Sequence, residues 1–242
     1  MSVYLLVHGA WHGGWCWRDV KCILEAEGHS VHSPTLTGLG SKAHLMSRGI
    51  TMERMVGDIV KELMNHDLQD VVLVGHSFAG PVITGAADRE PERIRCLIYL
   101  DAAILEDGET MFSSLSPEIV AERRKLAEET SGGVSLPVPP TAAFGILDPQ
   151  QAEYAAQHLT PHPLSSYETP LRLNSRPGDV APCSYIKCTD PVYAALEASR
   201  QRAYDFGWPI YELKTGHDAM ISAPEATAAL LTQLGEEARR IY

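Results

Sequence analysis

Short apolar runs that alternate with helix-like patterns constrain the fold of this chain more than any other feature of its sequence. Six runs are rich in β-branched, leucine or aromatic residues: 4–7, 30–33, 71–74, 94–100, 184–188 and 210–213. Such runs, separated by amphipathic stretches, are typical of parallel strands that are covered by helices on both faces. The sequence therefore predicts an α/β protein whose mostly parallel sheet is flanked by helices.

The clearest predicted helix lies at residues 51–65. Thr51 is a suitable N-cap, because its hydroxyl can accept a hydrogen bond from a free backbone N–H of the first turn. The apolar residues after it recur at helical spacing and predict one buried stripe: Met52, Met55, Val56, Ile59, Val60, Leu63 and Met64.

Residues 106–182 interrupt the alternation of strands and helices. Ten of the 16 prolines of the chain lie in this segment, and proline cannot donate the backbone hydrogen bonds that a central strand needs. A charged segment at 118–130 predicts a helix with a solvated face. We therefore predict a helical cap at 106–182, inserted into a core formed by residues 1–105 and 183–242.

Composition narrows the classes of partner. The 31 acidic and 20 basic residues give a net charge of −11, which argues against binding to nucleic acid or to an anionic membrane. No apolar run approaches the roughly 18–20 residues that span a bilayer, and the start MSVYLLV reads as a strand rather than a signal peptide. Five cysteines without a CxxC pair predict a reduced, cytoplasmic setting. The sequence makes no prediction of oligomeric state.

The segment VVLVGHSFAG at residues 71–80 carries the main chemical signal. A buried strand runs into a tight turn centred on Ser77, with the small residues Gly75 and Ala79 on either side and an apolar helix behind. This is the context of a nucleophilic serine, whose strained turn lifts the hydroxyl above the sheet edge. The usual pattern has glycine where this chain has Ala79, which is still small, and Gly80 comes next.

The loop HGAWHGG at residues 8–14 follows the first predicted strand. Acyl transfer builds an oxyanion that preorganised backbone N–H groups stabilise, and this loop can supply one from Ala10 or Trp11. The second would come from Phe78, directly after the predicted nucleophile. The alternative, a metal site at His8 and His12, lacks the helix that their spacing would need. We therefore expect no metal and no cofactor, and a structural hydrogen-bonding role for His8.

A histidine follows the last predicted strand. His217 lies in the loop KTGHDAM at residues 214–220, which is where this order of elements places the general base for a serine nucleophile. The sequence thus predicts a pair of Ser77 and His217 at the carboxyl edge of the sheet.

These segments together resemble a known family. The stretch HGAWHGGWCW at 8–17, the GHS at 75–77, Cys188-Thr189 and Gly216-His217 are similar to bacterial esterases of the α/β-hydrolase superfamily, relatives of the plant methylesterase and hydroxynitrile-lyase group. The whole chain also resembles the small bacterial carbendazim-hydrolysing esterases. The resemblance implies an α/β-hydrolase fold and cleavage of a small aromatic or heteroaromatic ester or carbamate ester, such as methyl benzimidazol-2-ylcarbamate, with Trp15 and Cys16 as candidate substrate-binding residues.

The acid that would orient His217 has two candidates. In the related esterases it follows the strand predicted at 184–188, but a gapless match puts Pro191 at that position, with Asp190 one residue early. Asp101 ends the apolar run 94–100, and a carboxylate there needs a polar partner such as His217. We favour Asp101 and keep Asp190 as the alternative.

The same fold can also carry a lyase or a small-molecule receptor. The hydroxynitrile lyases carry a lysine just after the corresponding histidine, whereas Asp218 follows His217 here, so the lyase alternative loses support. A non-catalytic small-molecule receptor is disfavoured by the intact Ser77 and His217 pair.

Overall fold

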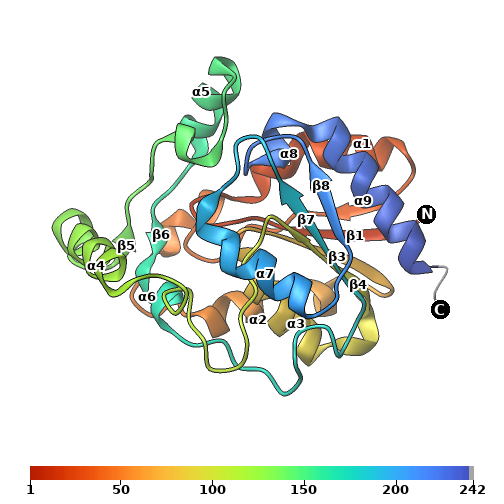
Figure 1. The fold of residues 1–242 in the computed structure, drawn as a ribbon, viewed down its shortest axis with the longest axis horizontal. Helices are drawn as coiled ribbons and strands as arrows, with labels where there is room; N and C mark the ends of the chain where they lie inside the picture. Colours follow the sequence, from red (N-terminus) through yellow and green to blue (C-terminus); the bar gives the residue numbers. More distant parts are fainter. Residues whose placement is uncertain (240–242) are drawn as a thin grey trace.

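The computed structural model describes residues 1–239, and its centre is a six-stranded parallel sheet with helices on both faces (Figure 1). The predicted strands are confirmed to within two residues at each end. In spatial order they are β2 (Ser30–His32), β1 (Val3–Val7), β3 (Val71–His76), β4 (Ile94–Leu100), β7 (Cys183–Cys188) and β8 (Ile210–Leu213). Every residue of β3 and β4 is buried, whereas β8 is half exposed because it has only one neighbouring strand.

Helices cover the sheet from two sides. The longer helices of the core are α1 (Arg18–Ala26), α2 (Met52–Asn65), α3 (Ala79–Arg89), α7 (Glu197–Asp205) and α9 (Pro224–Arg239). The core also contains short helices: α8 (Ala219–Ser222), η1 (Gly14–Trp17), η2 (Gly40–Leu45), η3 (Pro91–Arg93) and η5 (Ala194–Leu196). Within β3, Val72 faces α9 and Gly75 faces α3. The two residues are three apart along the strand, so they lie on opposite faces of the sheet. The predicted helix at 51–65 is confirmed, and the Thr51 hydroxyl accepts from Arg54 N–H at 3.2 Å. The predicted buried stripe is wrong at Met64, which is 55% exposed in the last turn of the helix.

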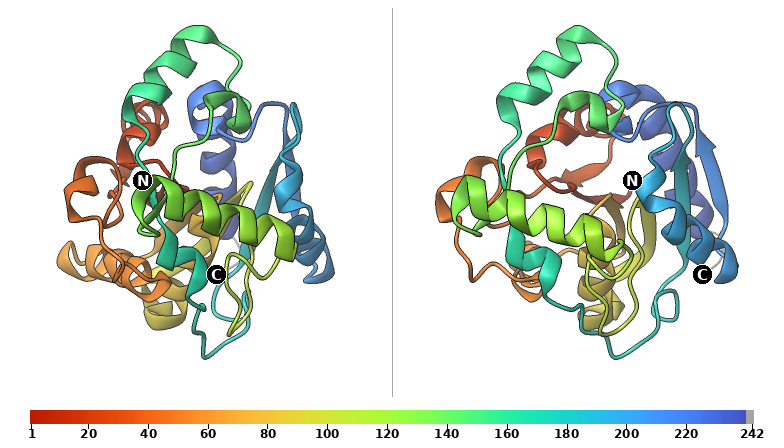
Figure 2. Two further views of the ribbon diagram at one scale, coloured as in Figure 1. Left: turned by 90° about the vertical axis from the view of Figure 1, so that its left-hand side faces the viewer. Right: turned by 60° about the vertical axis from the view of Figure 1, so that its left-hand side comes forward.

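The segment between β4 and β7 lies across the carboxyl end of the sheet (Figure 2). It contains α4 (Pro117–Ser131), β5 (Ser135–Leu136), η4 (Thr141–Phe144), α5 (Pro149–His158), β6 (His162–Pro163) and α6 (Leu164–Glu168). Helix α4 is mostly exposed, as its charge predicts. The antiparallel pair of β5 and β6 was not predicted, because two residues are too few to show a strand periodicity.

The topology opens a crevice at one edge of the sheet. The chain passes from β1 outward to β2 and then crosses to β3 on the other side of β1. The loops that follow β1 and β3 therefore leave in opposite directions, and ligands of α/β sheets bind at such a switch point. Among residues 1–239, no helix is long and apolar enough to cross a membrane.

Candidate active site

Ser77 occupies the turn between β3 and α3. Its φ of +54° is unfavourable for a residue with a side chain and costs about 1–3 kcal/mol in such a position. Three backbone hydrogen bonds hold the turn: Ser77 N–H donates to Leu100 O at 3.2 Å, and Gly80 N–H and Ala103 N–H donate to Ser77 O at 3.2 and 2.9 Å. The serine side chain is thereby fixed at the carboxyl edge of the sheet, half-buried.

Small residues around this turn are required by close backbone contacts. A Cβ at Gly75 would lie 3.0 Å from Ala79 O, and one at Gly80 would lie 1.8 Å from Ala103 O. The tightest contact is therefore at Gly80, one residue after Ala79, the position at which the usual motif has its second glycine. Ala79 is fully buried there without needing to be glycine.

A continuous chain of hydrogen bonds leads from Ser77 into the sheet. His217 Nε2 lies 2.9 Å from Ser77 Oγ, and His217 Nδ1 lies 2.7 Å from Asp101 Oδ2. The imidazole is 2% exposed and Asp101 is fully buried. With the proton on Nδ1, Nε2 has a lone pair directed at the serine hydroxyl, so this geometry can remove the proton of Ser77.

Asp101 also contacts a cation. Its Oδ1 accepts from Arg200 Nη2 at 3.0 Å, and the same nitrogen donates to Tyr193 O at 2.8 Å. Burial opposes ionisation of Asp101, but the hydrogen bond and charge of His217 together with Arg200 outweigh it and hold the pKa of Asp101 below its usual value. Tyr193 in turn stacks on His217, with ring centroids 4.1 Å apart and a 17° interplanar angle. Arg200 and Tyr193 have no sequence motif, and we did not predict them.

Asp190 lies outside this chain of hydrogen bonds. Its side chain is exposed and makes no hydrogen bond or ion pair with any of residues 1–239, while its N–H donates to Thr215 O. The sheet register explains the difference. Leu100 pairs with Ile186, so Asp101 is level with Lys187, and Asp190 follows three residues later. Three extended residues span about 10 Å.

Two backbone N–H groups on the segments next to Ser77 have no acceptor among the described residues. Among the described residues, neither Ala10 N–H nor Phe78 N–H makes a hydrogen bond, whereas Trp11 N–H donates to His162 Nδ1 at 3.3 Å. His8 Nδ1 donates to Gly9 O at 2.8 Å and so fixes the peptide that contains Ala10 N–H. Of the two loop donors predicted, Ala10 is thus the free one, and His8 has the expected structural role.

A second buried histidine–carboxylate pair stabilises the loop at residues 8–14. His12 Nε2 lies 2.9 Å from Asp218 Oδ2, and His12 Nδ1 lies 2.7 Å from Ala10 O. Both ring nitrogens face acceptors, which requires a protonated imidazole. Burial opposes that charge, but Asp218 outweighs it and raises the pKa of His12. This pair anchors the Ala10–Trp11 peptide. No sequence motif predicts it.

The buried group of His76, His217 and Asp218 could supply metal-ligand atoms by proximity. His217, however, uses Nδ1 for Asp101 and Nε2 for Ser77, and His76 Nε2 donates to His217 O at 3.0 Å. These contacts use both ring nitrogens of His217 and place a proton on His76 Nε2, so none of these three atoms offers a free lone pair to a metal ion. The arrangement favours proton transfer rather than metal binding.

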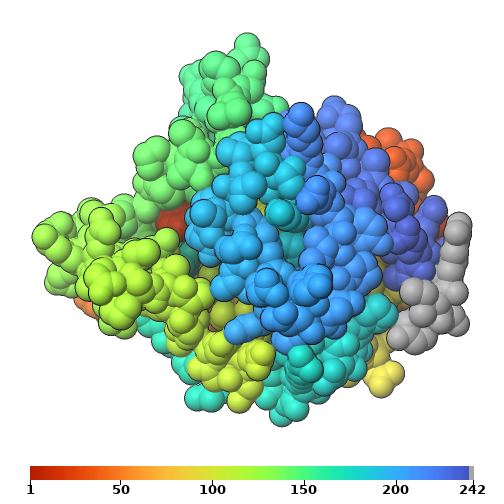
Figure 3. All heavy atoms as spheres, viewed as in Figure 1, coloured from red at the N-terminus to blue at the C-terminus, as the bar shows by residue number. Residues whose placement is uncertain are grey.

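A cavity of about 50 Å³ adjoins Ser77, and an outer groove of about 400 Å³ lies beside it. The two share four lining residues: Trp11, Arg123, Phe144 and Tyr193. Figure 3 shows a hollow on this side, between the segment coloured green and the light-blue region that contains α7, with N-terminal residues visible at its bottom. The outer groove is lined mainly by apolar residues of the segment after β4.

Trp15 and Cys16 lie elsewhere. Both line a separate pocket next to α5 rather than the cavity at Ser77. Cys16 is 3% exposed and belongs to the hydrophobic core, and Trp15 stacks on His12 at 5.4 Å between centroids. The structure therefore does not bring these two predicted substrate-binding residues to Ser77, because η1 turns them away from the sheet edge.

Comparison with known proteins identifies relatives over nearly the whole length. The model of the alpha/beta hydrolase family matches residues 4–230. A carbendazim hydrolyzing esterase from Nocardioides sp. (strain SG-4G) is 36% identical, over 97% of this chain and all of that protein. Methylesterase 17 of Arabidopsis thaliana is 25% identical over 94% of this chain and 89% of its own length.

A solved structure agrees in fold. An extracellular alpha/beta-hydrolase from a Paenibacillus species superposes with a TM-score of 0.83, at 23% identity, covering 96% of this chain and 98% of the other.

Proposed function

Because this chain belongs to the α/β hydrolase family and is a carboxylic-ester hydrolase, we propose that it cleaves small aromatic or heteroaromatic esters or carbamate esters through a triad of Ser77, His217 and Asp101. The observation that carries the proposal is the chain of hydrogen bonds, 2.9 Å from Ser77 to His217 and 2.7 Å from His217 to Asp101. Such a chain activates a hydroxyl that is otherwise a poor nucleophile.

In the proposed mechanism, Ser77 Oγ attacks the substrate carbonyl while His217 Nε2 takes its proton. The developing oxyanion accepts hydrogen bonds from Ala10 N–H and Phe78 N–H, the two unpaired donors at the site. His217 then gives its proton to the leaving alcohol, and an acyl-enzyme or carbamoyl-enzyme remains on Ser77. Water attacks this intermediate with His217 again as the base and restores the serine.

Asp101 holds the Nδ1–H tautomer of His217 and stabilises the imidazolium that forms. Its contacts with His217 and Arg200 keep it ionised despite its burial. The exposed Asp190 has no part in this mechanism.

The segment 106–182 is proposed to act as a cap that selects the substrate. Its apolar groove suits an aromatic ring, and the cavity at Ser77 is so small that the cap must shift to admit one. Arg123 lines both spaces and has no carboxylate partner among the described residues. Its guanidinium is therefore available to a carbonyl or ring-nitrogen acceptor on the substrate.

The first substrate to test is methyl benzimidazol-2-ylcarbamate, since the relative at 36% identity is a carbendazim hydrolyzing esterase. With this substrate, methanol leaves in the first half-reaction. Hydrolysis of the carbamoyl-enzyme gives a carbamic acid, which loses CO₂ to form the amine. A carbamate carbonyl is less electrophilic than that of an ester, so the two oxyanion donors matter more here.

The test is a hydrolysis screen over aryl, alkyl and carbamate methyl esters, with emulsified triolein as a contrast. Aromatic methyl esters and carbamates are expected to be turned over faster than triolein. Ser77→Ala should lower the rate by on the order of 10⁶ and abolish labelling by a fluorophosphonate. The control is Ser47→Ala, which removes an exposed hydroxyl distant in sequence from Ser77. Labelling of Ser77→Ala at the wild-type level would contradict the proposal.

A further inference from the structure

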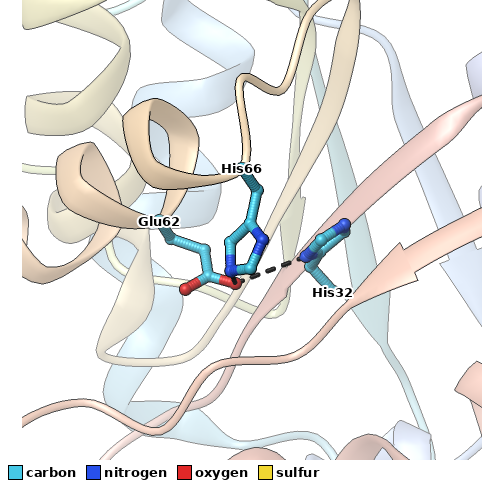
Figure 4. A group of neighbouring side chains, drawn as sticks. All are labelled: His32, Glu62 and His66. Carbon is cyan, nitrogen blue, oxygen red and sulfur yellow. Dashed lines mark hydrogen bonds and ion pairs between the residues drawn. The ribbon is translucent and has the colours of Figure 1, made fainter.

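A second cluster of polar side chains lies away from Ser77, where the end of β2 meets the end of α2. His32 is the last residue of β2, Glu62 lies in the final turn of α2, and His66 follows that helix as its C-cap (Figure 4). His32 Nδ1 is 3.3 Å from Glu62 Oε1, and His66 Nε2 is 3.6 Å from the same oxygen. All three groups therefore converge on one point.

The separations fit a tetrahedral metal ion. Bonds of about 2.0–2.1 Å at tetrahedral angles put neighbouring ligand atoms about 3.3–3.4 Å apart. Two of the three separations are 3.3 and 3.6 Å, and all three ligand atoms lie within 4.8 Å of one another. The side chain of His66 is 53% exposed, so it has room to rotate and bring its nitrogen closer to that of His32.

The chemistry of the donors points to a particular class of ion. Imidazole nitrogen suits Zn²⁺ and its neighbours in the first transition row, whereas Ca²⁺ and Mg²⁺ prefer oxygen ligands only. In their metal-binding forms, two neutral imidazoles and one carboxylate supply three donors with a single negative charge. Three protein ligands leave a fourth position open to water.

We propose that His32, Glu62 and His66 form a surface binding site for Zn²⁺, separate from the catalytic chemistry. The ion joins β2, an edge strand of the sheet, to the helix that follows it. Because a ligand that binds the folded chain stabilises it by mass action, bound Zn²⁺ should raise the unfolding temperature without changing hydrolysis.

Zinc binding is measured by titrating the untagged full chain with Zn²⁺ in a calorimeter, and with Co²⁺ as an optical probe of tetrahedral coordination. One equivalent is expected to bind at this site, with a rise in Tm of at least about 2–4 °C at saturating Zn²⁺. His66→Ala and His32→Ala should each weaken binding at least about tenfold and remove the rise in Tm, since each deletes one of three ligands.

Two further measurements make the result specific. Glu62→Gln keeps the shape of the side chain but removes its charge, and it should also weaken binding. His44→Ala removes an exposed histidine outside the cluster and should bind Zn²⁺ like the wild type. Unchanged affinity in both His66→Ala and His32→Ala would overturn the proposal, as would inhibition of hydrolysis by the first equivalent, which would place the ion at His217 instead.

Discussion

Replacing Asp101 by asparagine tests the proposed triad most sharply, because the structure fixes how the new amide must lie. The two carboxylate oxygens of Asp101 each face a donor: Oδ2 faces His217 Nδ1 at 2.7 Å and Oδ1 faces Arg200 Nη2 at 3.0 Å. An amide has one oxygen and one NH₂ group. In Asp101→Asn, the NH₂ group must therefore face one of these two donors, and that contact loses its acceptor.

The arginine is expected to win the amide oxygen. Arg200 always carries its proton and forms the stronger, charge-assisted hydrogen bond, whereas His217 can change its tautomer. The NH₂ group of the new residue would then face His217 and force the proton onto Nε2. In that tautomer His217 has no lone pair directed at Ser77 and cannot act as the base. The same change in a well-studied triad lowers the rate by about 10⁴, which corresponds to about 5.4 kcal/mol of lost transition-state stabilisation.

The measurement is kcat/KM for a hydrolysed aryl methyl ester, for Asp101→Asn beside the matched control Asp190→Asn. The control changes an exposed carboxylate without a side-chain partner among residues 1–239, so its rate should stay within about twofold of wild type. Circular dichroism and thermal unfolding confirm that both variants are folded. Greater loss in Asp190→Asn, or a loss below tenfold in Asp101→Asn, would refute the assignment of the acid.

Three other outcomes are expected. Gly80→Ala should lower the free energy of unfolding by about 1–3 kcal/mol or more in a denaturant titration, because its Cβ would lie 1.8 Å from Ala103 O. The control Gly57→Ala has open space around its Cβ and should be neutral or stabilising in the same titration. Burial lowers the pKa of His8 and His76 to about 3, so the unfolded chain binds more protons below the ordinary histidine pKa of about 6.5. The Tm should therefore fall as the pH drops from 6.5 toward 3, and a flat profile over that range would contradict the buried neutral state. Hydrolysis should survive EDTA, since the proposed mechanism uses no metal; loss of activity that added Zn²⁺ restores would show the opposite.

The site combines two levels of organisation that have different origins. The residues near Ser77 could be predicted from local chemistry, because a tight turn needs small neighbours and an oxyanion needs free N–H groups. The supporting contacts of Arg200, Tyr193, His12 and Asp218 come from residues that no local pattern distinguishes. The predicted binding residues Trp15 and Cys16 show the same limit, because adjacency to the loop at residues 8–14 did not determine which way η1 would turn.

The sequence by itself determined the elements and their order. Alternating apolar runs predicted every strand of the six-stranded sheet, and the period of the apolar residues predicted α2, because burial on one face imposes a repeat that a single segment displays. The turn at Ser77 and the loop containing His217 were likewise readable, since each depends on residues next to it along the chain.

Only the tertiary structure shows that Asp101, and not Asp190, lies beside His217. Both carboxylates follow a strand that ends at the same edge of the sheet, and the sequence left them as alternatives. The choice depends on register: His76 pairs with Leu100, so the next residues, Ser77 and Asp101, leave their strands side by side. Strand β7 continues past that level before the chain reaches Asp190. Register is set by contacts between strands far apart in the chain, and a one-dimensional pattern does not record it.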